Sequence, residues 1–467
     1  MLNERESAEF VFRKRPRVYA YYRQAFVSVL IPDRPLIDHA YRGTGKQGQN
    51  ETPINEEADM KKTILLSSLL VLLLAIAPWA LAADIKVGTL LPHTGPLKEF
   101  GPPVQKGINL AAKQIAAAGF TIQLVHEDSE TAAIPGNNAA KKLVEIDQVV
   151  AIVGAMASGV TVPVAESVTC PSGVVMISPA STSPLITLLP ADQGKDFLFR
   201  TCPSDALQGV VAGKLAGASN KTAAVLYVNN PYGQGLAEQF KRSFEKMNGK
   251  VVAMVPHDEK ASESYTAELR KALADKPDRL CAFSYPEHAK VYLKEAIEFF
   301  KYRNFMFCDG TKSVDILDAL GAENVEGQMG TAPGSAGGEP YEIFSADYKA
   351  EYGELPPLPF ITNGYDGLAV IGLAAYAVKV KGLSMTSETI RDHLREVANP
   401  PGEVIKPGEF KKAFELLNAG KKINYEGAAG SVDFDKNGDV ITPIEIWKYA
   451  GGKIVTVRVE QDIPFEP

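Results

Sequence analysis

The chain has 467 residues, of which 45% are hydrophobic and 22% are charged, and its formal net charge is −7. This composition is that of a globular protein, so it excludes a disordered chain, a collagen-like fibre and a small disulfide-rich scaffold. The negative charge also argues against a broad nucleic-acid-binding surface, which needs clustered Lys and Arg.

A secretory signal peptide is predicted at residues 60–82. Met60 is followed by two lysines, then an apolar stretch that ends at Ala77, then the small residues around Ala80 and Ala82. A basic start, an apolar middle and such a cleavage site are the three parts of a signal peptide. The apolar stretch is shorter than the roughly 20 residues that a membrane-spanning helix needs. We therefore expect translation to begin at Met60, with residues 1–59 a misassigned start or a disordered leader.

Short apolar strands alternate with amphipathic helices in the first part of the exported chain. This alternation predicts βαβ units and a parallel sheet. The predicted strands are 84–90, 121–125, 149–153 and 174–177, with a first helix that ends near Gly119 and further helices near 136–147 and 160–169.

The alternation restarts at Asp205 and continues until a glycine-rich break at 330–338. Four helices then dominate, and we expect no strands among them; the final stretch, 447–459, alternates like antiparallel strands. The predicted strands of this second block are 222–228, 250–255, 280–284 and 305–308, and the helices are 205–218, 233–247, 263–275, 287–302, 341–352, 360–381, 386–397 and 408–419.

Two α/β lobes follow from this order. The helices after residue 338 must pack on a sheet built earlier, most simply the first, so the chain crosses between lobes near 200–204, 330–334 and 430–435. Two lobes with three crossovers make a hinged cleft, a common place for a ligand. The expected division is 84–201 plus 333–430 for lobe 1 and 202–332 plus 431–467 for lobe 2.

The loops that follow the strands carry the candidate ligand groups, because ligands of open α/β sheets bind beyond the carboxyl ends of strands. The first block offers small hydroxyls and backbone N–H groups near helix starts, around Ser158 and Thr182, which favour a carboxylate. The second block offers Tyr232, Tyr285 and Asp309, which favour a cation. Together they suit a zwitterion such as an amino acid.

Several stretches resemble the leucine/isoleucine/valine-binding family of periplasmic substrate-binding proteins of ABC transporters. The resemblance covers essentially all of 84–467. It implies a type I two-lobe fold, a periplasmic location, a permease partner in the inner membrane, a monomer and no cofactor. The matching stretches are 85–96, 153–160, 177–184, 199–205, 232–236 and 430–435.

The resemblance also implies roles for the loop residues. Ser158, Ala180 and Thr182 would hold the ligand carboxylate, with Ser181 in the same loop. On the other lobe, Tyr232 and Tyr285 match aromatic positions, and Asp309 stands where the family often has an acidic partner for the ammonium. Phe100 matches an aromatic residue near the side-chain pocket.

The four cysteines permit disulfides in an oxidising compartment. We expect a disulfide between Cys170 and Cys202. Cys281 and Cys308 fall out of register on parallel strands, so we expect buried thiols there.

The function expected is a solute-binding component of an ABC importer for a small amino acid or similar carboxylate. A periplasmic sensor that feeds a signalling receptor is the alternative. We find neither the nucleophile, base and acid set of a hydrolase nor a close-spaced histidine pattern for a metal, so no enzyme activity is expected.

Overall fold

A computed structural model describes residues 83–461 and 463 of the chain. The predicted signal peptide and residues 1–59 lie outside them. Among the described helices, none is both long and apolar enough to cross a membrane.

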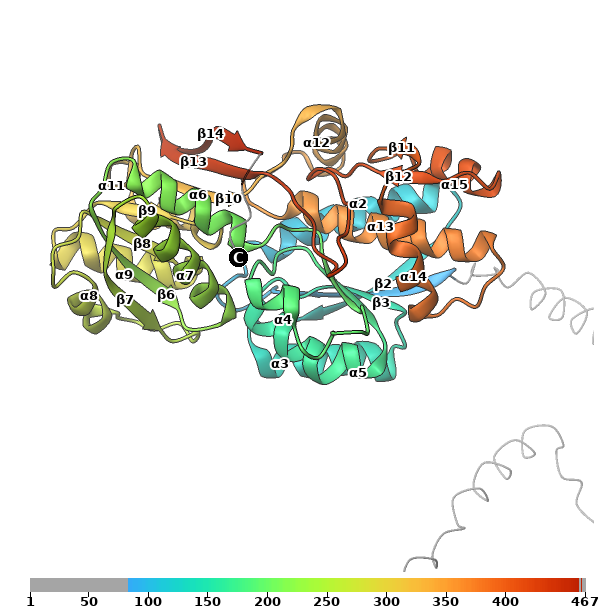
Figure 1. Cartoon of the computed structure of the whole chain (residues 1–467), viewed down its shortest axis with the longest axis horizontal. Coiled ribbons are helices and arrows are strands. Elements are labelled where there is room, and N and C mark those ends of the chain that lie inside the picture. The colour runs from blue at the N-terminus through green and yellow to red at the C-terminus, as the bar shows by residue number, and fades with distance from the viewer. Residues whose placement is uncertain (1–82, 462, 464–467) are drawn as a thin grey trace, which may run out of the picture. The chain divides into compact units, whose positions relative to one another are not determined.

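The first lobe is built on a five-stranded parallel sheet with the strand order β2-β1-β3-β4-β5 (Figure 1). The side chains of β3 and β4 are buried throughout, as expected for a parallel sheet covered on both faces. The strands are β1 (Ile85–Leu91), β2 (Ile122–Asp128), β3 (Ala151–Gly154), β4 (Val175–Ser178) and β5 (Leu198–Arg200), and the connecting helices are α2 (Gly101–Ala117), α3 (Ala133–Lys141), α4 (Ser158–Val164) and α5 (Cys170–Ser172).

Helices from the last third of the chain return to this first sheet. The long helix α13 is buried on nearly all sides, and it packs on α2 and on strands β3 and β4. The expectation that this region holds no strands is wrong, since Glu403–Ile405 and Ile423–Tyr425 pair as the short parallel strands β11 and β12. Strands of three residues carry too little periodicity to be recognised. The helices are α12 (Gly338–Tyr352), α13 (Ile361–Val380), α14 (Ser387–Ala398) and α15 (Phe410–Asn418).

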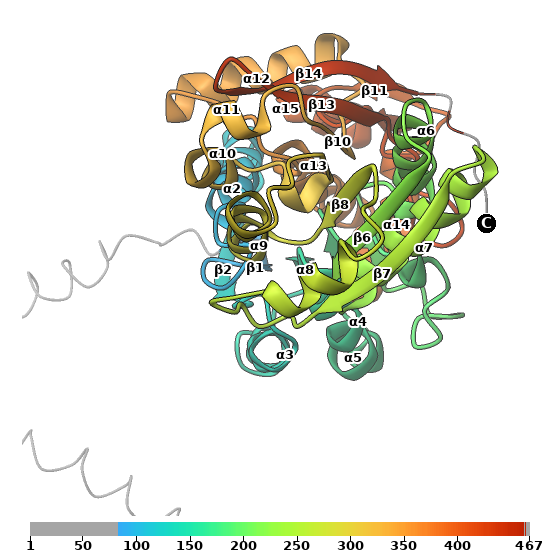
Figure 2. The ribbon, with the colours of Figure 1, turned by 90° about the vertical axis from the view of Figure 1, so that its left-hand side faces the viewer.

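The second lobe is built on a seven-stranded sheet with the order β14-β13-β10-β9-β8-β6-β7 (Figure 2). Alternate side chains of its strands face opposite layers: Phe283 packs on Phe240 of α7, whereas Leu280 belongs to a cluster with Leu293 of α9. The elements are β6 (Thr222–Val228), β7 (Lys250–His257), β8 (Arg279–Phe283), β9 (Phe305–Phe307), β10 (Met329–Pro333), β13 (Ile444–Ala450), β14 (Lys453–Glu460), α6 (Asp205–Gly217), α7 (Pro231–Lys246), α8 (Thr266–Ala272), α9 (Pro286–Phe299), α10 (Val314–Leu320) and α11 (Ala322–Val325).

The α/β architecture and the antiparallel end of the chain, β13 with β14, are as predicted. The glycine-rich break at 330–338 is only partly right, because its first four residues belong to β10, which joins the terminal hairpin to the parallel strands. Gly330 is needed there, since a Cβ at this position would lie 2.7 Å from the Trp447 ring. Packing, rather than backbone freedom, explains that glycine.

The chain passes between the two sheets three times, after β5, after β10 and before β13. The last passage stays on lobe 1 for longer than expected, since Phe434 packs on Phe199 and Asp439 pairs with Arg200. We therefore propose the two-lobe division predicted from the sequence, with the third crossover moved to about 440–443.

The predicted disulfide between Cys170 and Cys202 is wrong, because all four cysteines are free, buried thiols. Cys170 precedes the start of β4, whereas Cys202 follows the end of the neighbouring parallel strand β5, so the two lie at opposite ends of these strands. Burial raises the pKa of Cys170 to about 12. Cys281 faces Met306 rather than Cys308 across β8 and β9, which is the offset predicted for that pair.

Two buried histidines lie side by side in lobe 2, with the rings of His257 and His288 4.7 Å apart. The His257 Nε2 is 2.7 Å from the Ser284 hydroxyl, and Tyr265 packs on both rings. Burial lowers the pKa of His257 to about 4 and that of His288, which also faces His257, to about 3. Both rings are therefore neutral at pH 7.

This pair predicts a loss of stability in acid. The unfolded chain binds protons at both histidines near pH 6.5, whereas the folded chain does not until about pH 4 or 3, so the free energy of unfolding falls as pH drops through that window. Taken alone, the two histidines contribute a slope that approaches two protons around pH 5, whereas the buried Asp366, whose pKa is raised to about 7 by burial, contributes with the opposite sign. Urea unfolding from pH 7 to 4 measures it, and His288→Phe should remove about one proton of slope. An unchanged slope in this variant would contradict the assignment.

Candidate functional site

A small cavity lies between the two lobes, at the carboxyl ends of strands from both sheets. Its volume is about 20 Å³, which is room for about one water molecule. Six of the eight predicted binding residues line it. They follow β1, β3, β4, β6, β8 and β9, as the strand-end argument requires: Phe100, Ser158, Ala180, Tyr232, Tyr285 and Asp309.

The lobe 1 wall is mostly apolar, with two aromatic rings, and the one hydroxyl among its described lining residues is that of Ser158. Ser158 is the first residue of α4, and its Oγ accepts a hydrogen bond from the backbone N–H of Ser183 at 3.2 Å. Ala180 lies in the loop after β4, whose backbone is held by the Ser178 hydroxyl. Phe100 precedes α2 and is fully buried. This wall holds no acidic side chain among the described lining residues, so it suits the carboxylate end of a ligand.

The lobe 2 wall carries two stacked tyrosines and an acid. Tyr232 and Tyr285 lie nearly parallel, with ring centroids 5.6 Å apart. The Tyr232 hydroxyl donates to Asp309 Oδ1 at 2.8 Å, and the Tyr285 hydroxyl accepts from Asn230 at 3.0 Å. Gly310 must lack a side chain here, since a Cβ would approach the Ser284 carbonyl oxygen to 2.3 Å.

A second acid, Asp205, lies behind this wall. Asp309 Oδ1 also accepts from Gln208 Nε2 at 2.7 Å, and one oxygen of Asp205 has no hydrogen-bond partner among the described residues. Burial raises the pKa of Asp309, and burial together with the nearby charge of Asp309 raises the pKa of Asp205 well above its usual value. Two buried carboxyls that disfavour each other's ionisation would be stabilised by a cation.

Two predicted residues, Ser181 and Thr182, do not line the cavity. The Ser181 hydroxyl contacts the carbonyl oxygens of Ala155 and Met156, so it braces the loop from inside. The Thr182 hydroxyl donates to Asp205 Oδ2 at 2.8 Å and so positions that acid. A sequence motif fixes the loop but not which of its side chains faces the ligand.

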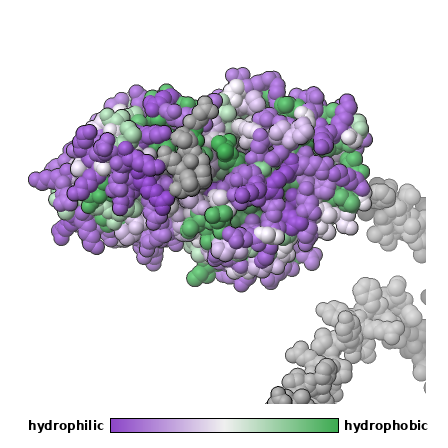
Figure 3. Space-filling view, viewed as in Figure 1, coloured by the Kyte–Doolittle hydropathy of each residue, from purple (hydrophilic) through white to green (hydrophobic). Residues whose placement is uncertain are grey.

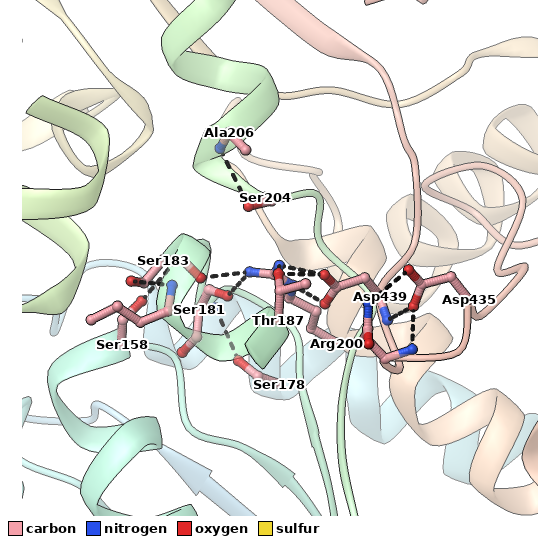
Figure 4. Close-up of polar contacts among 12 residues, drawn as sticks. Ser158, Ser178, Ser181, Ser183, Thr187, Arg200, Ser204, Ala206, Asp435 and Asp439 are labelled. Carbon is pink, nitrogen blue, oxygen red and sulfur yellow. Dashed lines mark hydrogen bonds and ion pairs between the residues drawn. The ribbon is translucent and has the colours of Figure 1, made fainter. Parts of the chain in front are cut away.

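Arg200 holds the same loop from beneath and is completely buried (Figure 4). It donates to the carbonyl oxygens of Ser181 and Ser183, the latter at 3.0 Å. Its guanidinium also makes two parallel bonds to Asp439, of 2.6 and 2.8 Å, and one to the Thr187 hydroxyl. The binding loop of lobe 1 is thereby tied to the third crossover.

The cleft edges are bridged by polar contacts between lobes. Glu99, in the loop after β1, accepts from the Ser313 hydroxyl and from the Val314 backbone N–H at 2.8 Å, at the start of α10. Lys98 pairs with Glu287 at 3.2 Å. These contacts link the two lobes beside the cavity. The face of the protein seen in Figure 3 is largely hydrophilic, with a few apolar patches.

Five further residues line the cavity without having been predicted: Leu97, Met156, Ala157, Gly310 and Phe360. Most are neighbours of predicted residues in the same loops. Phe360 comes from the start of α13, far away in sequence, and nothing in its local pattern indicates a site. Asp205 could have been predicted as a site residue, because it is the last residue of one of the matching stretches, 199–205.

Three comparisons with known proteins bear on the function of this site. The model of a family described as periplasmic binding protein matches residues 84–448. A chemotactic substrate-binding protein, BasB of Halobacterium salinarum, is 27% identical over 75% of this chain and 83% of its own, and the Leu/Ile/Val-binding protein BraC3 of Rhizobium johnstonii is 26% identical over 84% and 99%. The structure of the leucine-binding protein LivK of Thermotoga maritima superposes with a TM-score of 0.68 at 25% identity, covering 81% of this chain and 99% of that one.

The buried pair of Arg200 and Asp439 predicts a large effect of Asp439→Ala. The variant leaves the Arg200 charge buried with one partner fewer, so the free energy of unfolding should fall by about 3–5 kcal/mol. Asp433→Ala, an exposed acid in the same segment, is the matched control and should cost less than about 0.5 kcal/mol. Equal midpoints for the two variants in urea unfolding would contradict the role given to the pair.

Proposed function

Because the chain belongs to the periplasmic binding protein family, we propose that it binds a small amino acid, branched-chain or related, or a similar carboxylate between its lobes and delivers it to an ABC permease in the inner membrane. The observation that carries the proposal is the polarity of the cavity. The Ser158 hydroxyl, at the start of α4, is the one hydroxyl among the described lining residues on the lobe 1 side, and a buried acid with two tyrosines lines the lobe 2 side.

Family membership carries the broader classification. The chain is of the leucine/isoleucine/valine-binding type I kind, as the sequence predicted, and the fold agrees with that of LivK. The members of this family are solute-binding proteins rather than enzymes, and their location is periplasmic or extracellular.

The two ends of an amino acid match the two walls. In this proposal Ser158 and the backbone near Ala180 hold the α-carboxylate, and Asp309, assisted by Asp205, holds the ammonium. The stacked rings of Tyr232 and Tyr285 add a face for the cation and exclude water. Hydrogen bonds of this charge-assisted kind contribute about 1.5–3 kcal/mol each.

Ligand binding would shift the lobes toward the closed arrangement. Only a ligand that contacts both walls binds the closed form more tightly than the open one, and that difference is what drives closure. The cavity as it stands has room for about one water molecule, so a bound amino acid requires the two walls to lie farther apart than they do here. The closed pair of lobes is the form offered to the permease.

A thermal-shift panel of amino acids and small carboxylates tests the ligand class. A compound present at 100 times its dissociation constant should stabilise the fold by about 2.7 kcal/mol. Asp309→Asn and Ser158→Ala should each weaken its binding about tenfold or more, because each removes one end of the ligand's contacts.

The matched controls are Asp433→Asn and Ser167→Ala, an exposed acid and an exposed serine whose hydroxyl contacts the Pro163 carbonyl oxygen and the Asn137 side chain, away from the cavity lining. Both should bind as the wild type does. A panel in which nothing stabilises the protein removes the amino-acid assignment, and unchanged affinity in both site variants removes the residue assignment.

A sensor role is the second candidate, favoured by the likeness to the chemotactic protein BasB. The same cleft would then report ligand to a receptor rather than feed a permease. Deleting the gene separates the two roles. We expect uptake of the radiolabelled panel ligand to fall in the deletion strain; unchanged uptake with a lost behavioural response would favour sensing.

A further inference from the structure

A second and larger cavity lies on the hinge side of the molecule, where α12 comes beside the β13–β14 hairpin (Figures 1 and 2). Its volume is about 400 Å³, within the range of small-molecule sites and far above that of the cleft cavity. It is lined by the second crossover, 333–337, by the loop 355–360 and the first residues of α13 in lobe 1, and by strands β13 and β14 of lobe 2.

One wall of this hinge cavity is polar and carries a neutralised ion pair. Lys312 and Glu445 are both buried and bonded to each other, and the second oxygen of Glu445 accepts from the Thr456 hydroxyl. Both oxygens of the acid are thus occupied, so its charge is not available to a ligand cation.

The α12 side adds a positive group. Lys349 lines the cavity and makes no ion pair with any described residue, and the Tyr341 hydroxyl lies near Glu445, whose charge together with burial raises the tyrosine pKa. The net charge of the lining is therefore +1, which suits an anion.

The opposite wall is apolar and stiff. It is formed by the run Leu355-Pro-Pro-Leu-Pro359, whose three proline rings fix the backbone angles. A wall that is already ordered loses little entropy when a ligand packs on it. Together with the positive group, this wall suits an acid with an apolar body.

Phe360 lies between this cavity and the cleft, because it lines both. Its backbone is left-handed, with φ 72° and ψ 0°, a conformation that an aromatic residue adopts only when its surroundings impose it. Any movement of the ring on the hinge side therefore changes the wall of the cleft cavity.

We propose that the hinge cavity is a second binding site, for an organic carboxylate with an apolar body, and that Phe360 couples it to the cleft. The carboxylate faces Lys349 and the Tyr341 hydroxyl, and the apolar body packs on the proline run. Since the cavity is lined by both lobes and by a crossover, its occupant biases the open–closed equilibrium.

Methyl NMR of the protein with 3-phenylpropionate tests the site. Signals of Leu358, Ile454 and Val459, which line the hinge cavity, should shift to saturation, and the neutral 3-phenylpropanamide should shift them much less. Lys349→Glu should weaken the acid at least threefold, whereas Lys411→Glu, an exposed lysine on α15, should not. Leu97 and Met156 report the cleft separately.

Each outcome of this experiment either supports the proposal or overturns it. Shifts confined to the cleft signals, no shifts at all, or equal shifts with the amide would overturn the site. Secondary shifts at Leu97 and Met156 that vanish in Phe360→Gly, while the hinge signals persist, support the coupling; their persistence overturns it. Phe360→Leu serves the same comparison if the glycine variant does not give a folded spectrum. The result is independent of whether any amino acid binds in the cleft.

Discussion

The arrangement of the binding cleft depends on the buried charge of Arg200. A guanidinium that is fully buried must have its donors satisfied, and here they are met by Asp439, by Thr187 and by the carbonyl oxygens of Ser181 and Ser183. One residue thus fixes the loop that offers Ala180 to the ligand and anchors the segment that leads to the hinge. Because the pair with Asp439 is bidentate and enclosed, it fixes geometry as well as charge.

The opposite lobe presents the reverse case, a buried acid that makes no ion pair with any described residue. Asp309 accepts hydrogen bonds from Tyr232 and Gln208, but burial still disfavours its charge and raises its pKa, and its charge in turn raises the pKa of Asp205. A ligand ammonium would offset the unfavourable energy of this buried negative charge, so the acid favours the binding of a positively charged group. The two lobes are therefore complementary in charge, and a zwitterion that bridges them stabilises the closed form.

Much of this could be predicted from the sequence, because it follows from local rules. Long strands and amphipathic helices have clear periods, and the ends of parallel strands point to the loops of Ser158, Tyr285 and Asp309. The features that could not be predicted from the sequence depend on tertiary packing. The three-residue strand β11 has no readable period, Ser181 turns inward to bond carbonyls, and Phe360 reaches the cleft from a distant helix. The Cys170–Cys202 disulfide was wrong because one cysteine precedes β4 and the other follows the parallel β5, which places them at opposite ends of the strands.

The central claim is that one small zwitterion bridges the two walls, and a crystal structure with the most stabilising panel compound tests it most directly. The account predicts the ligand ammonium within about 3 Å of the Asp309 carboxylate and the ligand carboxylate at the same distance from the Ser158 hydroxyl. A ligand bound outside this cleft, or held with its carboxylate against Asp309, would contradict it.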